Sequence, residues 1–172
     1  SLIQQIQEGR LDQRGNAQAY QGGWQELVSG VNSLIDAFVA PIMMTAASLD
    51  RISRGDIPAK LTQEYQGDFN EIKHNVNQLI ETMQGLLNEI NTLIHSVQDG
   101  QLTARGNPDH FVGEWKTLVV GMNNVIKAFE KPITVAAAKI DRIAKGDIPD
   151  KIVEEYKGDF NAIKENLNLL ID

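Results

Sequence analysis

The sequence predicts an all-α protein made of repeated units, each consisting of a helix, an extended connector and a second helix. Three observations lead to this fold class. The chain repeats itself after 91 residues, apolar residues recur at the alternating three- and four-residue spacing of helix seams, and long polar segments with glycine separate the seams. Because each copy of a repeat is one structural unit stacked on the next, such a chain suits a mechanical or interaction role better than a chemical one.

The repeat outweighs any single motif. Of the 81 positions that a shift of 91 residues aligns, 41 are identical, and Trp24 falls on Trp115. A shorter period lies inside the 91-residue repeat, because four glycines that follow helical patterns are spaced by 46, 45 and 46 residues. Glycine just past a helix is the expected C-terminal signal. The predicted helix ends are Gly9, Gly55, Gly100 and Gly146.

An aromatic residue follows each of these glycines by 14 or 15 positions, and a helical pattern resumes there. The chain therefore divides into four units that alternate in type. We expect the first unit to hold a truncated first helix and the fourth a truncated second helix, as in a segment cut from a longer chain. The predicted units are residues 1–38, 39–84, 85–130 and 131–172.

The apolar spacing identifies the packing. From Phe69 to Val97 the apolar steps alternate between three and four residues over four heptads, which is the seam of a left-handed coiled coil or four-helix bundle. One uninterrupted helix of about 30 residues should cover this stretch. Across all units, the predicted bundle core consists of Trp24, Leu27, Val31, Leu34, Phe38, Phe69, Ile72, Val76, Leu79, Met83, Leu86, Ile90, Leu93, Val97, Trp115, Leu118, Met122, Val125, Phe129, Ile133, Ile140, Ile143, Phe160, Ile163, Leu167 and Leu170.

Two other junctions break this rhythm. After Phe38 and Phe129 the seam resumes one residue late, and Pro41 and Pro132 stand at the slip. One extra residue turns the core-facing stripe by about 100° on a 3.6-residue helix. Since proline starts a helix well and interrupts one badly, we expect these prolines to mark a hinge where a first helix opens.

The connectors are too long for an antiparallel hairpin, which needs about 2–5 loop residues. About a dozen extended residues reach far enough to climb back beside the helix just left, so the second helix should run parallel to the first. In the first and third units, Gly15 and Gly106 stand where the second and fourth units have an apolar residue. We therefore expect Tyr20 and Phe111 to pin the connectors of the first and third units. The predicted connector anchors are Leu11, Ile57, Leu61, Leu102, Ile148 and Ile152.

Two parallel helices cannot enclose a core, since each leaves an apolar stripe open. A second identical chain would close the core with two-fold symmetry. The predicted architecture is therefore a series of tandem parallel four-helix coiled-coil bundles formed by a homodimer. The alternative is a monomeric helical scaffold or interaction repeat that folds its stripes on itself.

Composition narrows the function classes. The net charge of −7 disfavours nucleic-acid binding, which needs a basic face. The absence of cysteine excludes disulfides and thiolate metal sites and fits a reducing cytoplasm. We expect no apolar run near the ~20 residues of a membrane span, and no signal peptide. A membrane anchor would then belong to another part of the parent chain.

The chain resembles a poly-HAMP array, as found in bacterial methyl-accepting chemotaxis proteins and sensor histidine kinases. The matching marks are a proline before a first helix (Pro41, Pro132), a helix-ending glycine with an apolar residue two positions later, an acidic residue opening the second helix, and an asparagine further along (Asn32, Asn77, Asn123, Asn168). The resemblance implies a non-catalytic signal-relay segment. Its partners would be a second copy and the input and output domains of the same chain, without nucleic acid or direct membrane contact.

The slips at the two prolines suggest how such a relay works. Successive bundles cannot share one helix rotation without strain, so adjacent units should prefer different packings. A change in one would pass with opposite sense to the next, which needs two discrete packings separated by a few kcal/mol.

No residue pattern predicts catalysis, a cofactor or a metal site. His74, His95 and His110 have no partner at metal-ligand spacing and are expected at the surface. No nucleophile–base pair, phosphate loop or carboxylate dyad occurs. The four asparagines are expected to bond to a connector or to lie next to the core rather than to sense a ligand.

Overall fold

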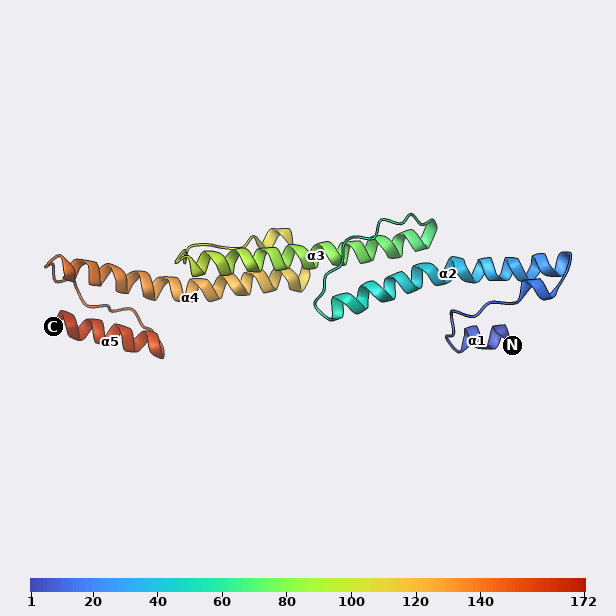
Figure 1. Cartoon of the computed structure of the whole chain (residues 1–172). Helices are drawn as coiled ribbons and strands as arrows, with labels where there is room; N and C mark the ends of the chain where they lie inside the picture. The colour runs from blue at the N-terminus through green and yellow to red at the C-terminus, as the bar shows by residue number, and fades with distance from the viewer. The chain divides into compact units, whose positions relative to one another are not determined.

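The computed structural model describes residues 1–172 and consists of helices and irregular segments, which confirms the all-α prediction (Figure 1). The chain divides into two compact halves, Ser1–Gln84 and Gly85–Asp172, and we describe each by itself. The α-helices are α1 (Leu2–Gln7), α2 (Gly23–Ser53), α3 (Gly67–Gln98), α4 (Gly113–Ala144) and α5 (Asp159–Ile171), with 3₁₀ turns η1 (Ala17–Ala19) and η2 (Pro108–His110).

The helices end where the glycines predict. Gly55 and Gly146, with φ of 80° and 77°, lie two residues past the last residues of α2 and α4. The residue after each glycine donates back to the last turn, as Asp56 N does to Arg51 O at 3.0 Å. This is the Schellman arrangement, in which the left-handed conformation satisfies carbonyls that the helix leaves free.

Four connectors separate the helices, and we number them 1 to 4 along the chain: residues 8–22, 54–66, 99–112 and 145–158. Each connector runs back along the helix it has left, so that the next helix begins at the far end and runs parallel to the first (Figure 1). Parallel neighbours contact through aromatic pairs. Phe38 on α2 meets Phe69 on α3 edge to face at 5.4 Å, and Phe129 on α4 meets Phe160 on α5 at 5.5 Å.

The helices α2 and α4 pass through the two prolines without a break, so the prediction that Pro41 and Pro132 open new helices is wrong. Proline inside a helix costs about 3 kcal/mol, because it removes one hydrogen bond and crowds the preceding turn. Both rings are buried, and strong apolar periodicity continues on either side. Burial and the seams therefore offset the cost. α3 runs uninterrupted from Gly67 to Gln98, as its seam predicts.

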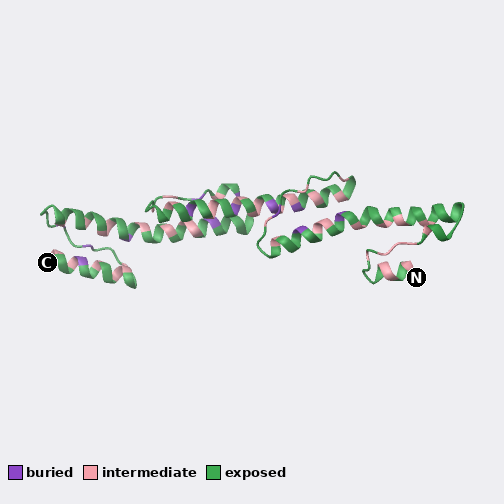
Figure 2. Ribbon diagram, in the orientation of Figure 1, coloured by how far each residue is buried: buried purple, intermediate pink, exposed green.

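Few residues are fully buried within one chain (Figure 2). The one cluster of mutually packed buried residues lies in the C-terminal half and joins Leu86 of α3, Phe111 of connector 3 and Val119 of α4. Most of the long apolar side chains are exposed along the helices. The single chain thus leaves most of its helix seams open.

By length and composition, α2 could cross a membrane, which corrects the expectation that no apolar run approaches that length. Between Glu26 and Asp50 its one charged residue is Asp36. Asp36 accepts hydrogen bonds from Arg14 of connector 1 at 2.8 and 2.6 Å. A helix that carries an ion pair and a polar connector along one side favours protein neighbours over lipid.

Candidate functional site

Each connector is held by an asparagine from the helix that follows it. The asparagine amide accepts from the N–H and donates to the C=O of one connector residue, so both backbone groups of that residue are satisfied. The two distances are 2.8 and 2.8 Å for Asn32 on Gly15, 2.7 and 3.0 Å for Asn77 on Leu61, 2.8 and 2.9 Å for Asn123 on Gly106, and 2.7 and 3.0 Å for Asn168 on Ile152. We call these four contacts the asparagine clamps. Bonding to a connector is thus the role that the structure gives these asparagines.

A cation precedes each clamped residue and pairs with an acid further along the helix that carries the asparagine, or, for Asp172, with the residue that caps that helix. Arg14 pairs with Asp36 at 2.6 Å. The corresponding pairs are Lys60–Glu81, Arg105–Glu130 and Lys151–Asp172. The lysine pairs are about half exposed, and exposed ion pairs are worth about 0–1 kcal/mol, so they orient the connectors more than they stabilise them.

The clamped residue differs between odd and even connectors, and the helix differs with it. Connectors 1 and 3 place glycine at the clamp, facing Val28 and Val119 on the next helix. A Cβ on Gly15 would lie 2.8 Å from Val28 Cγ1, and one on Gly106 would lie 3.1 Å from Val119 Cγ1. In the odd connectors, the side chain that fills the space beside the clamp therefore comes from the helix.

In the even connectors, the side chain that fills this space comes from the connector itself. Connectors 2 and 4 place Leu61 and Ile152 at the clamp, and Ile152 is buried. Lys73 and Lys164 take the helix position of the valines and are half-buried. A lysine stem can pack along apolar surface while its ammonium stays in water, so it leaves room for the larger connector residue.

The odd connectors are also one residue longer between the glycine and the aromatic residue that opens the next helix. The 3₁₀ turns η1 and η2 lie in this stretch and have no counterpart in connectors 2 and 4. In each turn an asparagine side chain caps the backbone, with Gln18 N on Asn16 Oδ1 at 3.1 Å and Asp109 N on Asn107 Oδ1 at 3.0 Å. The extra residue is therefore absorbed as a capped turn.

An aromatic residue stands four positions before the helix-opening aromatic in every connector: Tyr20, Tyr65, Phe111 and Tyr156. Phe111 is buried and pins connector 3, as predicted. Tyr20 does not pin connector 1, because it is 51% exposed.

The other predicted anchors are buried to different degrees. Leu11, Ile57, Leu61 and Leu102 are half-buried, and Ile152 is buried. Ile148 is 64% exposed in the single chain, and the adjacent Pro149 occupies the buried place. Pro58 is buried in the same way beside Ile57. The sequence Gly-Asp-Ile-Pro occurs in both copies of the repeat, so the burial of the proline that follows each anchor could have been predicted from it.

The predicted bundle core divides into three groups in one chain, which differ in burial. Val76, Leu86, Leu93 and Leu167 are buried. The larger group lines an exposed stripe, led by Trp24 at 69% exposed. Members of this exposed stripe are Trp24, Leu27, Val31, Leu34, Phe38, Ile72, Val97, Trp115, Leu118, Val125, Phe129, Ile133, Ile140, Ile163 and Leu170. The remaining predicted positions, namely Phe69, Leu79, Met83, Ile90, Met122, Ile143 and Phe160, are half-buried.

Sequence reasoning missed the residues that are buried most completely, Ile80 and Val119. They lie one helical turn from Asn77 and Asn123, on the side that faces the connectors. Their spacing from the asparagines could have shown them. Each long helix therefore has two apolar stripes, one covered by its own connector and one open.

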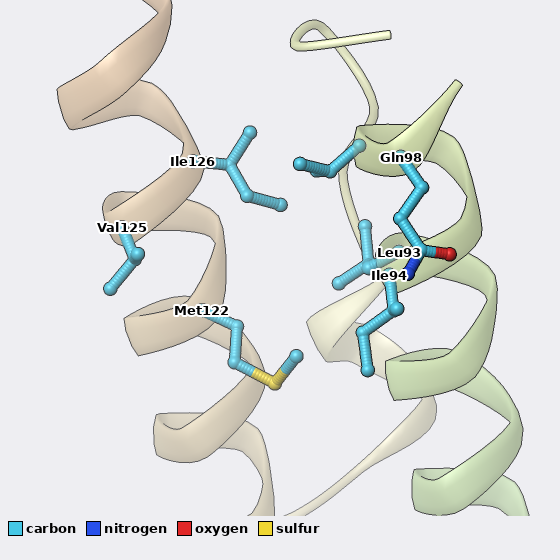
Figure 3. Close-up of a pocket in the computed structure, with 7 residues that line it drawn as sticks. Leu93, Ile94, Gln98, Met122, Val125 and Ile126 are labelled. Atoms are coloured by element: carbon cyan, nitrogen blue, oxygen red, sulfur yellow. The ribbon is translucent and has the colours of Figure 1, made fainter. Parts of the chain in front are cut away.

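In the C-terminal half the open stripe forms an apolar groove between α3 and α4 (Figure 3). Met122 and Ile126 of α4 point towards Leu93 and Ile94 of α3. The groove continues past Val97 and Val125 to Phe129 and Ile133. Gln98 is the one polar residue in its lining, so a surface of this kind suits contact with another apolar surface.

Charged side chains reinforce two helix ends. Arg51 donates to Asp56 at 2.6 Å and Arg142 to Asp147 at 2.5 Å, bridging the last turn and the residue after the glycine. These hydrogen bonds lower the pKa of Asp56 and of Asp147. A hydrogen bond from Lys116 likewise lowers the pKa of Asp109 in η2.

The three histidines lie apart. His74 and His95 are exposed on α3, and His110 lies in η2, where its Nε2 is 2.9 Å from Asn107 Nδ2. No group of three or more metal-ligating side chains is placed to hold a metal ion.

The HAMP domain family matches residues 19–85 and 110–172, together more than half of the chain. Connectors 2 and 4 lie inside the matched segments, whereas connectors 1 and 3 lie for the most part outside them. No solved structure matches the chain. The helix–connector–helix geometry and these two matches in register confirm the resemblance seen in the sequence, and the chain belongs to the HAMP domain family, as a tandem array of signal-relay linkers.

Proposed function

We propose that this chain is the signal-relay segment of a bacterial chemoreceptor or sensor kinase, and that it works as a parallel homodimer in the cytoplasm. In this proposal the four predicted units each form a four-helix bundle with the same unit of a second copy. Input and output domains of the same longer chain move and read the array. The segment itself binds no nucleic acid and no membrane.

The open stripe is the observation that carries this proposal. A compact monomer of 19.1 kDa exposes about 8,400 Å², whereas this chain exposes 12079 Å². Its exposed residues include the large aromatic side chains Trp24, Phe38 and Phe129. A second copy, related by a two-fold axis along the helices, presents the same stripe at the same height and can cover it.

The relay is supported by the slip in that stripe. From Phe38 to Ile42, and from Phe129 to Ile133, the exposed residues continue four positions on, where an unbroken heptad would place the next one three positions on. Bundles on the two sides of each proline then face their partner with different helix rotations. We propose that a change of packing on one side biases the other through the continuous helices α2 and α4.

Single cysteines test the dimer, because the chain has none of its own. We expect Leu34→Cys and Val125→Cys each to cross-link with itself across two copies on mild oxidation. Glu154→Cys in connector 4 is the control and should cross-link poorly. Sedimentation should give twice the 19.1 kDa mass. In an antiparallel pair, residue 34 of one copy would lie near residue 125 of the other or far from both cysteine positions, so neither variant would cross-link with itself. That result, or a stable monomer, would overturn the proposal.

A further inference from the structure

In connector 3 a carboxylate of the helix before it and an asparagine of the helix after it hold adjacent backbone residues. The carboxylate Oε1 of Glu89 on α3 accepts from Asn107 N at 2.6 Å. One residue earlier, Asn123 on α4 clamps both backbone groups of Gly106. We infer that Glu89 is a lock that fastens connector 3 to its first helix and makes this part of the array a fixed element.

Packing around the lock is tight on both sides. A Cβ on Gly106 would lie 3.0 Å from Glu89 Oε1 and 3.1 Å from both Leu93 Cδ1 and Val119 Cγ1. The backbone of connector 3 is thus in contact with α3 and α4 at the same residue. Phe111 inserts further along, against Leu86 and Val119. Glu89 itself is only half-exposed, which strengthens a hydrogen bond to a charged acceptor.

The even connectors have no such lock. Glu89 stands eleven residues before its helix-ending glycine, and the residues at that position before Gly55 and Gly146 are Met44 and Val135. Neither side chain can hold a backbone N–H as a carboxylate does. The counterparts of Asn107 are Thr62 and Val153, which are exposed and make no hydrogen bond to a helix. Their first helices reach the connector through flexible side chains instead: Lys139 Nζ donates to Asp150 O at 2.6 Å, Tyr65 Oη to Met44 Sδ at 3.7 Å, and the arginines of the last turn pair with Asp56 and Asp147.

This difference assigns roles within the proposed relay, on which the inference rests. For the first helix to shift past connector 3, a charge-assisted hydrogen bond must break and a wedged glycine must move. At connectors 2 and 4 no helix carboxylate holds a connector N–H, and the arginine, lysine and tyrosine side chains that bridge helix and connector can follow a shift of the helix by changing rotamer. The packing change of the relay therefore takes place beside the even connectors, and α3 with connector 3 carries it as a rigid piece.

Amide hydrogen exchange on the intact chain tests the lock. We compare the wild type with Glu89→Gln, which keeps an acceptor without the charge, and Glu89→Met, which introduces the residue that stands at position 44. Exchange at Asn107 should accelerate in that order, by about tenfold or more for the methionine variant. Glu71→Met on the same helix is the matched control, since Glu71 is exposed and makes no ion pair or side-chain hydrogen bond. In the wild type, Thr62 and Val153 should exchange faster than Asn107.

Equal exchange at Asn107 in the wild type and in both Glu89 variants would overturn the lock. Equal protection of Asn107, Thr62 and Val153 in the wild type would overturn it as well. Neither measurement depends on signal output. If Glu89 protects Asn107 but the cysteine variants show no parallel dimer, the lock stands and the proposed relay fails.

Discussion

At the scale of single residues, one asparagine in each connector clamp supplies two hydrogen bonds to the chain that crosses it. The carboxamide pairs with N–H and C=O of the same residue, which a shorter or singly polar side chain cannot do. Because the clamped backbone is partly buried, removing the amide leaves both groups short of a partner. The clamps are thus the main polar contacts between connectors and helices.

We predict that Asn77→Ala destabilises the fold by about 1–3 kcal/mol, because it leaves the N–H and C=O of Leu61 unpaired. Asn77→Asp should fall between this variant and the wild type, since the carboxylate still accepts but cannot donate. Thermal unfolding followed by circular dichroism measures the loss. The control is Asn75→Ala two residues earlier, where the side chain is exposed and unbonded; an equal loss at both positions would contradict the clamp.

A second residue-scale prediction concerns pH. The hydrogen bond from Arg142 lowers the pKa of Asp147 below its usual 3.8. A lowered pKa in the folded state means that the contribution is present above the usual value and is lost as pH falls through the folded value. Asp147→Asn should therefore lower the unfolding temperature slightly at pH 7, and this loss should shrink as the pH falls through the lowered pKa of Asp147. The exposed Glu154→Gln should leave the unfolding temperature unchanged, and a loss for Asp147→Asn that stays constant as the pH falls would contradict the prediction.

At the scale of elements, the odd and even connectors fill the space beneath the asparagine clamp in two different ways. The volume beneath the clamp is filled by a valine from the helix in one type and by a leucine or isoleucine from the connector in the other. The aromatic residue before the next helix and the asparagine itself stay the same. The two positions of each pair should therefore be coupled in stability.

We predict this coupling for Gly15 and Val28. Gly15→Ala should cost about 1–3 kcal/mol, because its Cβ would lie 2.8 Å from Val28 Cγ1. In Gly15→Ala/Val28→Ala the glycine substitution should cost much less, and a double-mutant cycle of unfolding free energies measures the difference. Gly30→Ala is the control, since nothing lies within 4 Å of its Cβ and alanine favours the helix by about 1 kcal/mol. Strict additivity at positions 15 and 28 would exclude the steric pair.

Helix continuity shows where reasoning from the sequence reached its limit among the elements. The uninterrupted seam from Phe69 to Val97 predicted α3, because its period is a local property of the chain. Pro41 and Pro132 were expected to open helices, since the local cost of proline is known but the compensating burial is not. Both rings are buried in continuous helices, so tertiary packing decided against the local preference.

At the scale of the whole molecule, each chain carries one covered and one open apolar stripe, and the open stripe slips at the prolines. If the proposed relay depends on this slip, removing it should matter more than changing a side chain nearby. We predict that deleting Lys131 restores a three-residue step between Phe129 and the isoleucine now at 133. The bundles on the two sides of Pro132 should then adopt the same rotation.

Cross-linking of cysteines at Val125 and Ile140, and the signal output of the longer parent protein, measure the effect of this deletion. Lys131→Ala is the matched control, because it keeps the chain length and the slip. We expect the deletion to change both the cross-linking pattern and the output while the substitution leaves them as in the wild type. Unchanged packing and output after the deletion would exclude the slip as the source of the relay.

The sequence by itself determined where the helices end, the uninterrupted α3, the parallel course of the two helices that a connector joins, and the family. These follow from local or periodic features: glycine past a helix, heptad spacing, connector length and the 91-residue repeat. Tertiary structure alone decided which stripe the chain covers itself, with Ile80 and Val119 inside and Trp24 outside. It also decided the pairing of Gly15 with Val28 and of Glu89 with Asn107. The physical reason is that these contacts join residues 13 and 18 positions apart, and only the fold-back of a connector brings them within reach.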